Sequence, residues 1–186
     1  LFRSGFTFDL MSDKDFLASN KKYKTVIFVN AFTLNAAERK ALKAKVRRKG
    51  TTAVYLFGAG YVTPEGFSTS AMEDLTGIRI LADDKGRGSS LQFGFNKMSI
   101  PGPGTDAPER FVVADPAAKT LGIYLNDKKC GAAVKTLADG SKAVFIGKYL
   151  RSEVQWYNLL RHLGNRNTCA PRNYARRHGD LVMFHT

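Results

Sequence analysis

The chain has 186 residues, of which 44% are apolar and 11% aromatic, so it is long enough to bury the core of one domain. No apolar run approaches the length of a membrane-spanning helix and no signal peptide is recognisable, which argues against a membrane protein. Its 29 Lys and Arg against 16 Asp and Glu give a net charge of +13, which favours acidic partners. Cys130 and Cys169 are the only cysteines, and their spacing fits no metal site. We therefore expect a soluble domain without a metal or other cofactor.

The N-terminal third predicts one strand–helix–strand unit. Residues 6–11 alternate as in a strand, Ser12 can cap a short helical turn, and residues 24–29 form a β-branched and aromatic strand. Asn35 and Glu38 have the spacing of a helix capping box, and Gly50 is a natural stop for the helix that follows. The next buried strand covers residues 52–57, so the two strands are expected to be parallel with a right-handed crossover.

The carboxyl ends of these two strands predict a ligand-binding edge, because ligands of open parallel sheets lie there. Asn30 follows the first strand, and Gly58, Ala59 and Gly60 follow the second. A nucleophile elbow, a tight strand-to-helix turn that presents Cys or Ser, needs small neighbours of this kind. The nucleophile is missing, since Ala59 has no attacking group, so we interpret Gly58–Gly60 as a vestigial elbow loop. A plain glycine turn and a weak phosphate cradle are the other readings.

The rest of the chain predicts further helices and strands. We expect a short helix from Ser68 or Thr69 that stops at Gly77, and a helix from Ser152 with Trp156, Leu159, Leu160 and Leu163 on one face. An Asp-Gly turn at residues 139–140 between two apolar runs predicts an antiparallel hairpin. Further strands are expected at residues 78–81, 91–95, 110–114, 121–125 and 180–186, and loops at 83–90 and 100–108.

A cluster of arginines without an intervening acid lies near the C-terminus. Its members are Arg161, Arg166, Arg172, Arg176 and Arg177, with Tyr174 among them. A basic patch with an aromatic residue is one sign of nucleic-acid binding. A solvated surface, or a face that meets an acidic neighbouring domain, explains it equally simply.

Several of these features resemble a known family. The stretch from Tyr23 to Ile78 is similar to the class I glutamine-amidotransferase-like domain. The similar features are the Tyr-Lys before a strand, the "ER" helix, the aromatic strand before a glycine turn, and Met72-Glu73-Asp74-Leu75-Thr76-Gly77-Ile78. That domain follows the catalytic barrel in beta-galactosidases of glycoside hydrolase family 42 and related large bacterial proteins. The likeness continues through Asp115, Leu121-Gly122, residues 132–135 and 143–147, and Leu163-Gly164.

The resemblance implies an α/β, flavodoxin-like three-layer sandwich with a mainly parallel sheet and an antiparallel hairpin section. It implies a single domain over residues 1–186 that lacks its first strand and belongs to a longer bacterial chain, cytoplasmic or exported with its parent. In family 42 such a domain is catalytically empty and serves assembly, so we expect a homo-oligomer or docking on a catalytic barrel of the same chain. The alternatives are a basic binding module for nucleic acid or an anionic glycan, and a residual hydrolase.

Overall fold

The computed structural model describes residues 4–83, 89–102, 110–166 and 181–184. Its helices are α1 (Asp13–Ala18), α2 (Ala36–Val46), α3 (Thr69–Thr76) and α4 (Glu153–His162). Its strands are β1 (Asp9–Met11), β2 (Thr25–Phe28), β3 (Thr52–Leu56), β4 (Val62–Thr63), β5 (Gly66–Phe67), β6 (Ile80–Asp83), β7 (Leu91–Phe93), β8 (Ser99–Ile100), β9 (Arg110–Val113), β10 (Lys119–Tyr124), β11 (Cys130–Thr136), β12 (Lys142–Ile146) and β13 (Leu181–Phe184). Within these ranges, no helix combines the length and the apolarity that a membrane span requires.

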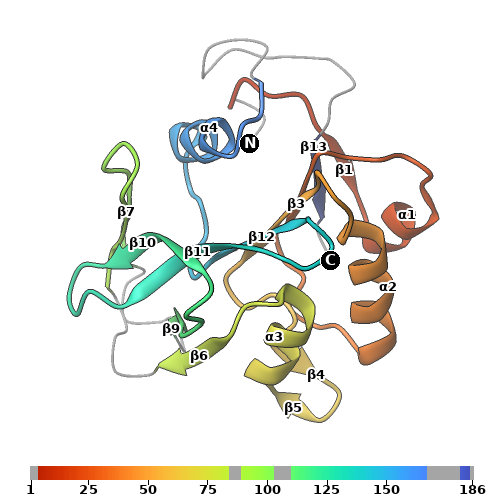
Figure 1. The fold of residues 1–186 in the computed structure, drawn as a ribbon, viewed down its shortest axis with the longest axis horizontal. Coiled ribbons are helices and arrows are strands. Elements are labelled where there is room, and N and C mark those ends of the chain that lie inside the picture. The colour runs from red at the N-terminus through yellow and green to blue at the C-terminus, as the bar shows by residue number, and fades with distance from the viewer. Residues whose placement is uncertain (1–3, 84–88, 103–109, 167–180, 185–186) are drawn as a thin grey trace.

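One mixed sheet organises the fold (Figure 1). It has nine strands in the order β1-β13-β2-β3-β12-β11-β10-β7-β8. The neighbours from β1 to β12 are parallel, and those from β12 to β8 are antiparallel. Two small sheets, β4–β5 and β6–β9, lie outside it. The predicted parallel pair β2–β3 and the predicted hairpin β11–β12 are confirmed.

The expectation of a mainly parallel sheet holds for one half only. The short turn between β11 and β12 reverses the chain and so allows only antiparallel pairing. Strands β10, β7 and β8 then extend the sheet from β11 in the same alternating sense. The architecture is therefore mixed α/β.

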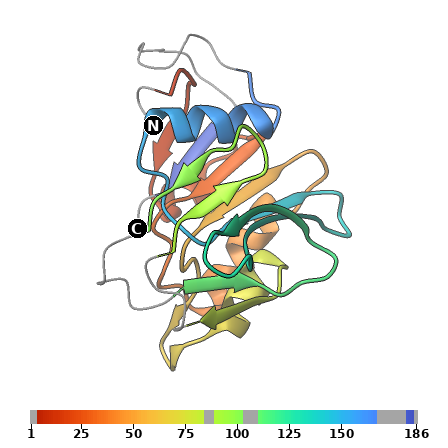
Figure 2. The ribbon, with the colours of Figure 1, turned by 90° about the vertical axis from the view of Figure 1, so that its left-hand side faces the viewer.

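Helices cover both faces of the parallel half, which explains its almost wholly apolar strands (Figures 1 and 2). On one face, side chains of α1, α2 and α3, such as Phe16, Leu42 and Leu75, pack with Phe145 of β12. On the other face, α4 packs through Trp156, Leu159 and Leu160 against a second cluster that includes Val144 and Ile146 of β12. Consecutive residues of β12 thus belong to two different cores.

Capping residues fix where the helices begin. The Asn35 side chain accepts a hydrogen bond from the backbone of Glu38 at 2.9 Å, and Glu38 accepts one from the Asn35 backbone at 2.8 Å, so the predicted capping box is confirmed. Ser152 and Gln155 form a second box at the start of α4. Ser68 caps α3, which ends at Gly77 in the left-handed conformation, as predicted.

The prediction that α2 continues up to a stop at Gly50 is wrong by three residues. The helix ends at Val46, because Arg47 leaves helical geometry and Arg48 turns the chain. The Arg48 guanidinium donates to the Tyr23 carbonyl at 3.1 Å and to the Thr51 hydroxyl at 2.9 Å. Gly50, with a φ of +85°, instead forms the turn into β3.

Candidate functional site at the carboxyl ends of the parallel strands

The loops that follow β2 and β3 are joined at one edge of the sheet. The Gly60 amide donates to the Ala31 carbonyl at 2.7 Å, and the Val62 amide donates to the Phe32 carbonyl at 3.0 Å. The carboxyl end of β12 lies beside them, because β12 pairs in parallel with β3 from Lys142 to Ile146. Three strand ends therefore meet where an open α/β sheet binds its ligands.

The structure places Gly58, Ala59 and Gly60 in a tight turn directly after β3. All three residues are buried, and Gly60 has a φ of +76°. The residue with the unusual backbone is Phe57, one position earlier, with a φ of +52°. A bulky residue in the left-handed region is rare, and strain of this kind concentrates at functional turns. Sequence reasoning missed Phe57 because nothing in its side chain signals a left-handed backbone.

Aromatic rings fill the space around this turn. The ring of Phe57 lies 5.2 Å from that of Phe111, 5.3 Å from that of Tyr149 and 6.1 Å from that of Phe32. A Cβ atom added at Gly58 would lie 3.4 Å from Phe32 and 3.5 Å from Phe111. Burial raises the pKa of the Tyr149 hydroxyl to about 12, so it stays protonated at neutral pH. Packed aromatic side chains therefore surround the turn where a nucleophile elbow would be expected.

Asn30 lies half-buried at the end of β2, as the sequence predicted for a residue of this edge. Its carbonyl accepts a hydrogen bond from the Phe32 amide at 2.8 Å, which turns the chain towards the aromatic rings. The edge is therefore shaped by backbone turns on both strands.

Lys148 is the polar residue that sequence reasoning missed at this edge. It follows β12 at the position equivalent to Asn30 and Gly58, and only 9% of it is exposed. Burial, together with the positive charges of Arg151 and Arg110, lowers the pKa of its amine to about 8. The rule that singled out Asn30 and Gly58, a residue just after an apolar strand, would have found it.

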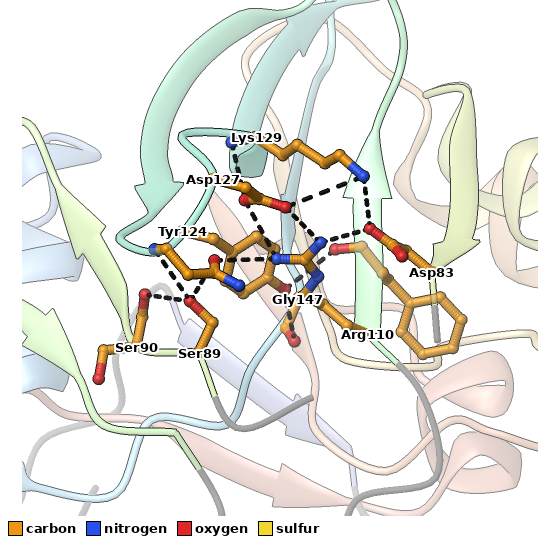
Figure 3. A network of polar contacts seen from close by, with 10 residues as sticks. Asp83, Ser89, Ser90, Arg110, Tyr124, Asp127, Lys129 and Gly147 are labelled. Carbon is orange, nitrogen blue, oxygen red and sulfur yellow. Dashed lines mark hydrogen bonds and ion pairs between the residues drawn. The ribbon is translucent and has the colours of Figure 1, made fainter. Parts of the chain in front are cut away.

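A buried arginine is the centre of a polar network beside this edge (Figure 3). Arg110, at the start of β9, is 4% exposed and forms ion pairs with Asp83 and, at 2.7 Å, with Asp127. It also donates to Asn126 at 3.2 Å, and its guanidinium carbon lies 4.6 Å from the ring centroid of Tyr124. The hydrogen bond from Arg110 holds the pKa of Asp127 below its ordinary value.

The network connects segments that are distant in sequence. The Tyr124 hydroxyl lies 3.0 Å from the Phe111 carbonyl and 3.3 Å from the Gly147 carbonyl, so it links β9 to the end of β12 (Figure 3). Lys129 reaches Asp83 at 2.8 Å. We infer that the network fixes the small sheet β6–β9 against the main sheet.

Only part of the predicted basic patch lies among the described residues. Arg161 and Arg166 are exposed at and beyond the end of α4, whereas Arg172, Arg176 and Arg177 lie outside the described residues. Burial raises the pKa of the Cys130 thiol, which disfavours the reactive thiolate. Cys169 is outside the described residues. Among the side chains that are described, no three His, Cys, Asp or Glu residues cluster as metal ligands.

A separate hollow lies between α2, α3 and the β4–β5 hairpin. Its volume is about 330 Å³, and its lining includes Arg39, Asp74, Ser68 and Phe67. Phe67 is 75% exposed, and its ring stacks on that of Tyr61 with a centroid distance of 5.2 Å. Aromatic residues are enriched at protein interfaces, so this exposed stacked pair is a candidate contact surface.

Comparison with known proteins relates this fold to glycoside hydrolases. No family model and no curated protein matches the sequence. Three similar solved structures are beta-galactosidases. One is a catalytic mutant of a GH42 enzyme from G. stearothermophilus, with a TM-score of 0.65 and 15% identity over 89% of this chain and 25% of that chain. The enzymes from Bacillus circulans sp. alkalophilus and Rahnella sp. R3 have TM-scores of 0.62 and 0.60, each with 16% identity over 88% of this chain and 26% of theirs.

The chain spans about a quarter of the length of these enzymes. At these identities the likeness concerns the fold alone. The described chain thus has the fold of one portion of the GH42 beta-galactosidases.

Proposed function

We propose that this chain is a non-catalytic, amidotransferase-like accessory domain of a glycoside-hydrolase-like protein, and that it serves assembly. The observation that carries the proposal is the occupied elbow: Phe57 and its aromatic neighbours fill the place where an active domain would hold a nucleophile. The fold shared with GH42 beta-galactosidases supports the association with glycoside hydrolases.

The strand order supports a flavodoxin-like ancestry. A flavodoxin-like sheet has the order 2-1-3-4-5. The parallel half of this sheet, β1-β13-β2-β3-β12, fits that order if β13, the last strand of the chain, occupies the place of strand 1. This agrees with the proposal that the domain is a variant of that architecture.

The assembly surface that we propose is the β4–β5 hairpin, where a second copy of the chain would cover Phe67. Burying an exposed aromatic ring contributes strongly to association, and a ring already stacked on Tyr61 loses little conformational freedom when it binds. The hollow beside it offers a concave partner surface.

The first experiment measures the solution mass by light scattering at low and moderate salt. A discrete oligomer whose mass does not depend on salt is expected, because an apolar contact is not screened. Phe67→Ser should lower the mass, whereas Val154→Ser, which changes an exposed apolar residue of α4, should not. A monomer at both salt concentrations would refute self-assembly; an oligomer that survives Phe67→Ser would refute only the proposed surface.

A second experiment tests the non-catalytic half of the proposal. Release of ammonia from glutamine should stay at the level of a buffer control. Glutamine hydrolysis that is abolished by Cys130→Ser, or by Cys169→Ser, would overturn it. Either variant removes one of the two thiols in the sequence while changing the side-chain volume little.

A further inference from the structure

The hollow beside the β4–β5 hairpin has a flat aromatic wall that is held in place. Phe67 lines the hollow and stacks on Tyr61 with the ring planes 6° apart, yet 75% of Phe67 is exposed, so Tyr61 supports one side of the ring and leaves the rest open. Val62 pairs with Phe67 across the hairpin, and the Leu34 amide donates to the Val62 carbonyl at 3.2 Å. The ring is therefore anchored to the body of the domain and can receive a flat ligand with little loss of conformational freedom.

The rest of the lining is polar and already ordered. Arg39 donates to the Asp74 carboxylate at 3.2 Å and to the Leu34 carbonyl at 2.7 Å, and Lys43 also binds this carboxylate. The Asp74 side chain is still 46% exposed, so its oxygens can accept further hydrogen bonds. Ser70 adds an exposed hydroxyl group to the lining.

The charges of the hollow balance, although the whole chain carries +13. The lining holds the carboxylates of Glu65 and Asp74 and the guanidinium of Arg39, and Lys43 binds Asp74 from beside it. An anion would find both cations already bound to Asp74, and a metal ion would find Asp74 already bound to two cations. The lining therefore suits a neutral ligand that forms hydrogen bonds.

We propose that this hollow binds a pyranose ring of a neutral sugar. Such a ring has C–H groups on its flat faces and hydroxyl groups around its rim. The C–H groups carry a slight positive charge and would lie on the negative face of the Phe67 ring, while rim hydroxyls would donate to Asp74 and exchange hydrogen bonds with Ser70. The volume of about 330 Å³ is within the range of small-molecule pockets.

The sugar site goes beyond the proposed role in assembly but shares Phe67 with it. A sugar and a second copy of the chain would compete for the open face of this ring. Where the protein assembles through Phe67, a bound sugar should therefore lower its solution mass.

The test is an amide NMR titration of the isotope-labelled protein with methyl β-D-glucopyranoside, a neutral sugar whose ring hydroxyls are equatorial. Sorbitol is the control ligand, because it is a polyol without a ring and so without a flat C–H face. At about 100 mM, roughly a hundred times a millimolar dissociation constant, the glucoside should shift the amides of residues 61–74 and sorbitol should not.

Variants of exposed residues then identify the ring. Phe67→Ala should weaken binding of the glucoside by roughly tenfold, whereas Phe67→Trp should retain it because it keeps an aromatic face. Val154→Ser, at an exposed position of α4, should bind as the wild type does.

The outcomes separate the sugar site from assembly. No shift of these amides with the glucoside, equal shifts with sorbitol, or equal binding by Phe67→Ala would overturn the sugar site, and light scattering measures assembly independently of all three. Binding that depends on Phe67 but leaves the mass of an oligomer unchanged would support the sugar site and place the assembly contact elsewhere.

Discussion

Replacing Lys148 by methionine should stabilise the protein at neutral pH. The pKa of this amine falls from 10.5 to about 8 in the fold. Because one pKa unit corresponds to about 1.4 kcal/mol, keeping the amine charged at pH 7 costs about 3 kcal/mol relative to the unfolded chain. Methionine retains a flexible apolar stem without the charge, so we expect Lys148→Met to raise the free energy of unfolding at pH 7 by about 2 to 3 kcal/mol.

The pH dependence gives a stricter test. Below the folded pKa of about 8 the amine is charged in both states, and the full cost is present. Between pH 8 and 10.5 the unfolded state holds the proton and the folded state does not, so the wild type gains stability as the pH rises. The advantage of the Lys148→Met variant should therefore shrink by about 2 kcal/mol, roughly two-thirds of the cost at pH 7, between pH 7 and pH 9.5.

The assay is urea unfolding of both proteins in chloride buffer without phosphate or carboxylate at the two pH values. Titration of tyrosines affects both proteins and cancels in their difference. Lys142→Met should differ little from the wild type at either pH, because that lysine is exposed. If Lys148→Met is less stable than the wild type, or if its advantage is the same at both pH values, the amine has a counter-charge and the reasoning is wrong.

Four further substitutions test other parts of the structure. Arg110→Met leaves Asp83 and Asp127 without their main partner and should lower the free energy of unfolding in urea by about 3 kcal/mol. Arg110→Lys should not restore this stability, because lysine lacks the planar guanidinium fork. Full stability of the lysine variant would contradict the reasoning. Burial alone would raise the pKa of Asp115, but the hydrogen bonds that its carboxylate accepts hold the pKa below the ordinary 3.8. The stability that Asp115 contributes is therefore present above pH 3.8 and is lost as the pH falls through the lower pKa of the folded state. Asp115→Asn should flatten the acid side of a plot of stability against pH, and an unchanged acid side would contradict this. Ser152→Ala removes the cap of α4 and should lower stability by about 1 kcal/mol, measured with Ser70→Ala, at an exposed position inside α3, as a control. Phe57→Ala should cost about 3 kcal/mol by opening a cavity among the aromatic rings, and a neutral result would contradict this, because alanine keeps the Cβ atom and does not relieve the left-handed backbone.

Local chemistry explains which parts of the fold could be predicted. Capping residues such as Asn35 and Ser152 and the Asp-Gly turn act within a few residues, so their structures follow from the adjacent sequence. The end of α2 could not be predicted in this way. It depends on contacts of Arg48 with Tyr23, a residue just before β2, which only the folded chain brings together.

The candidate site shows the same division. Gly58–Gly60 and Asn30 were recognised because strand ends are visible in the sequence as the ends of apolar runs. The left-handed backbone of Phe57 was not, because tertiary packing between Phe111 and Tyr149 holds it. Arg110 and its carboxylates come from three separate segments, so no spacing in the sequence links them.

The position of β13 has a consequence for how this chain folds. β13 lies between β1 and β2, so the two N-terminal strands do not touch as neighbours in the sheet. The backbone N–H and C=O groups on the edge of β2 that faces β1 have no strand partner until residues 181–184 pair with them. During synthesis on a ribosome, β1 and β2 must therefore wait, with open backbone groups, until residues 181–184 have emerged. Such long-range closure is slow and exposes the waiting edge to pairing with other chains.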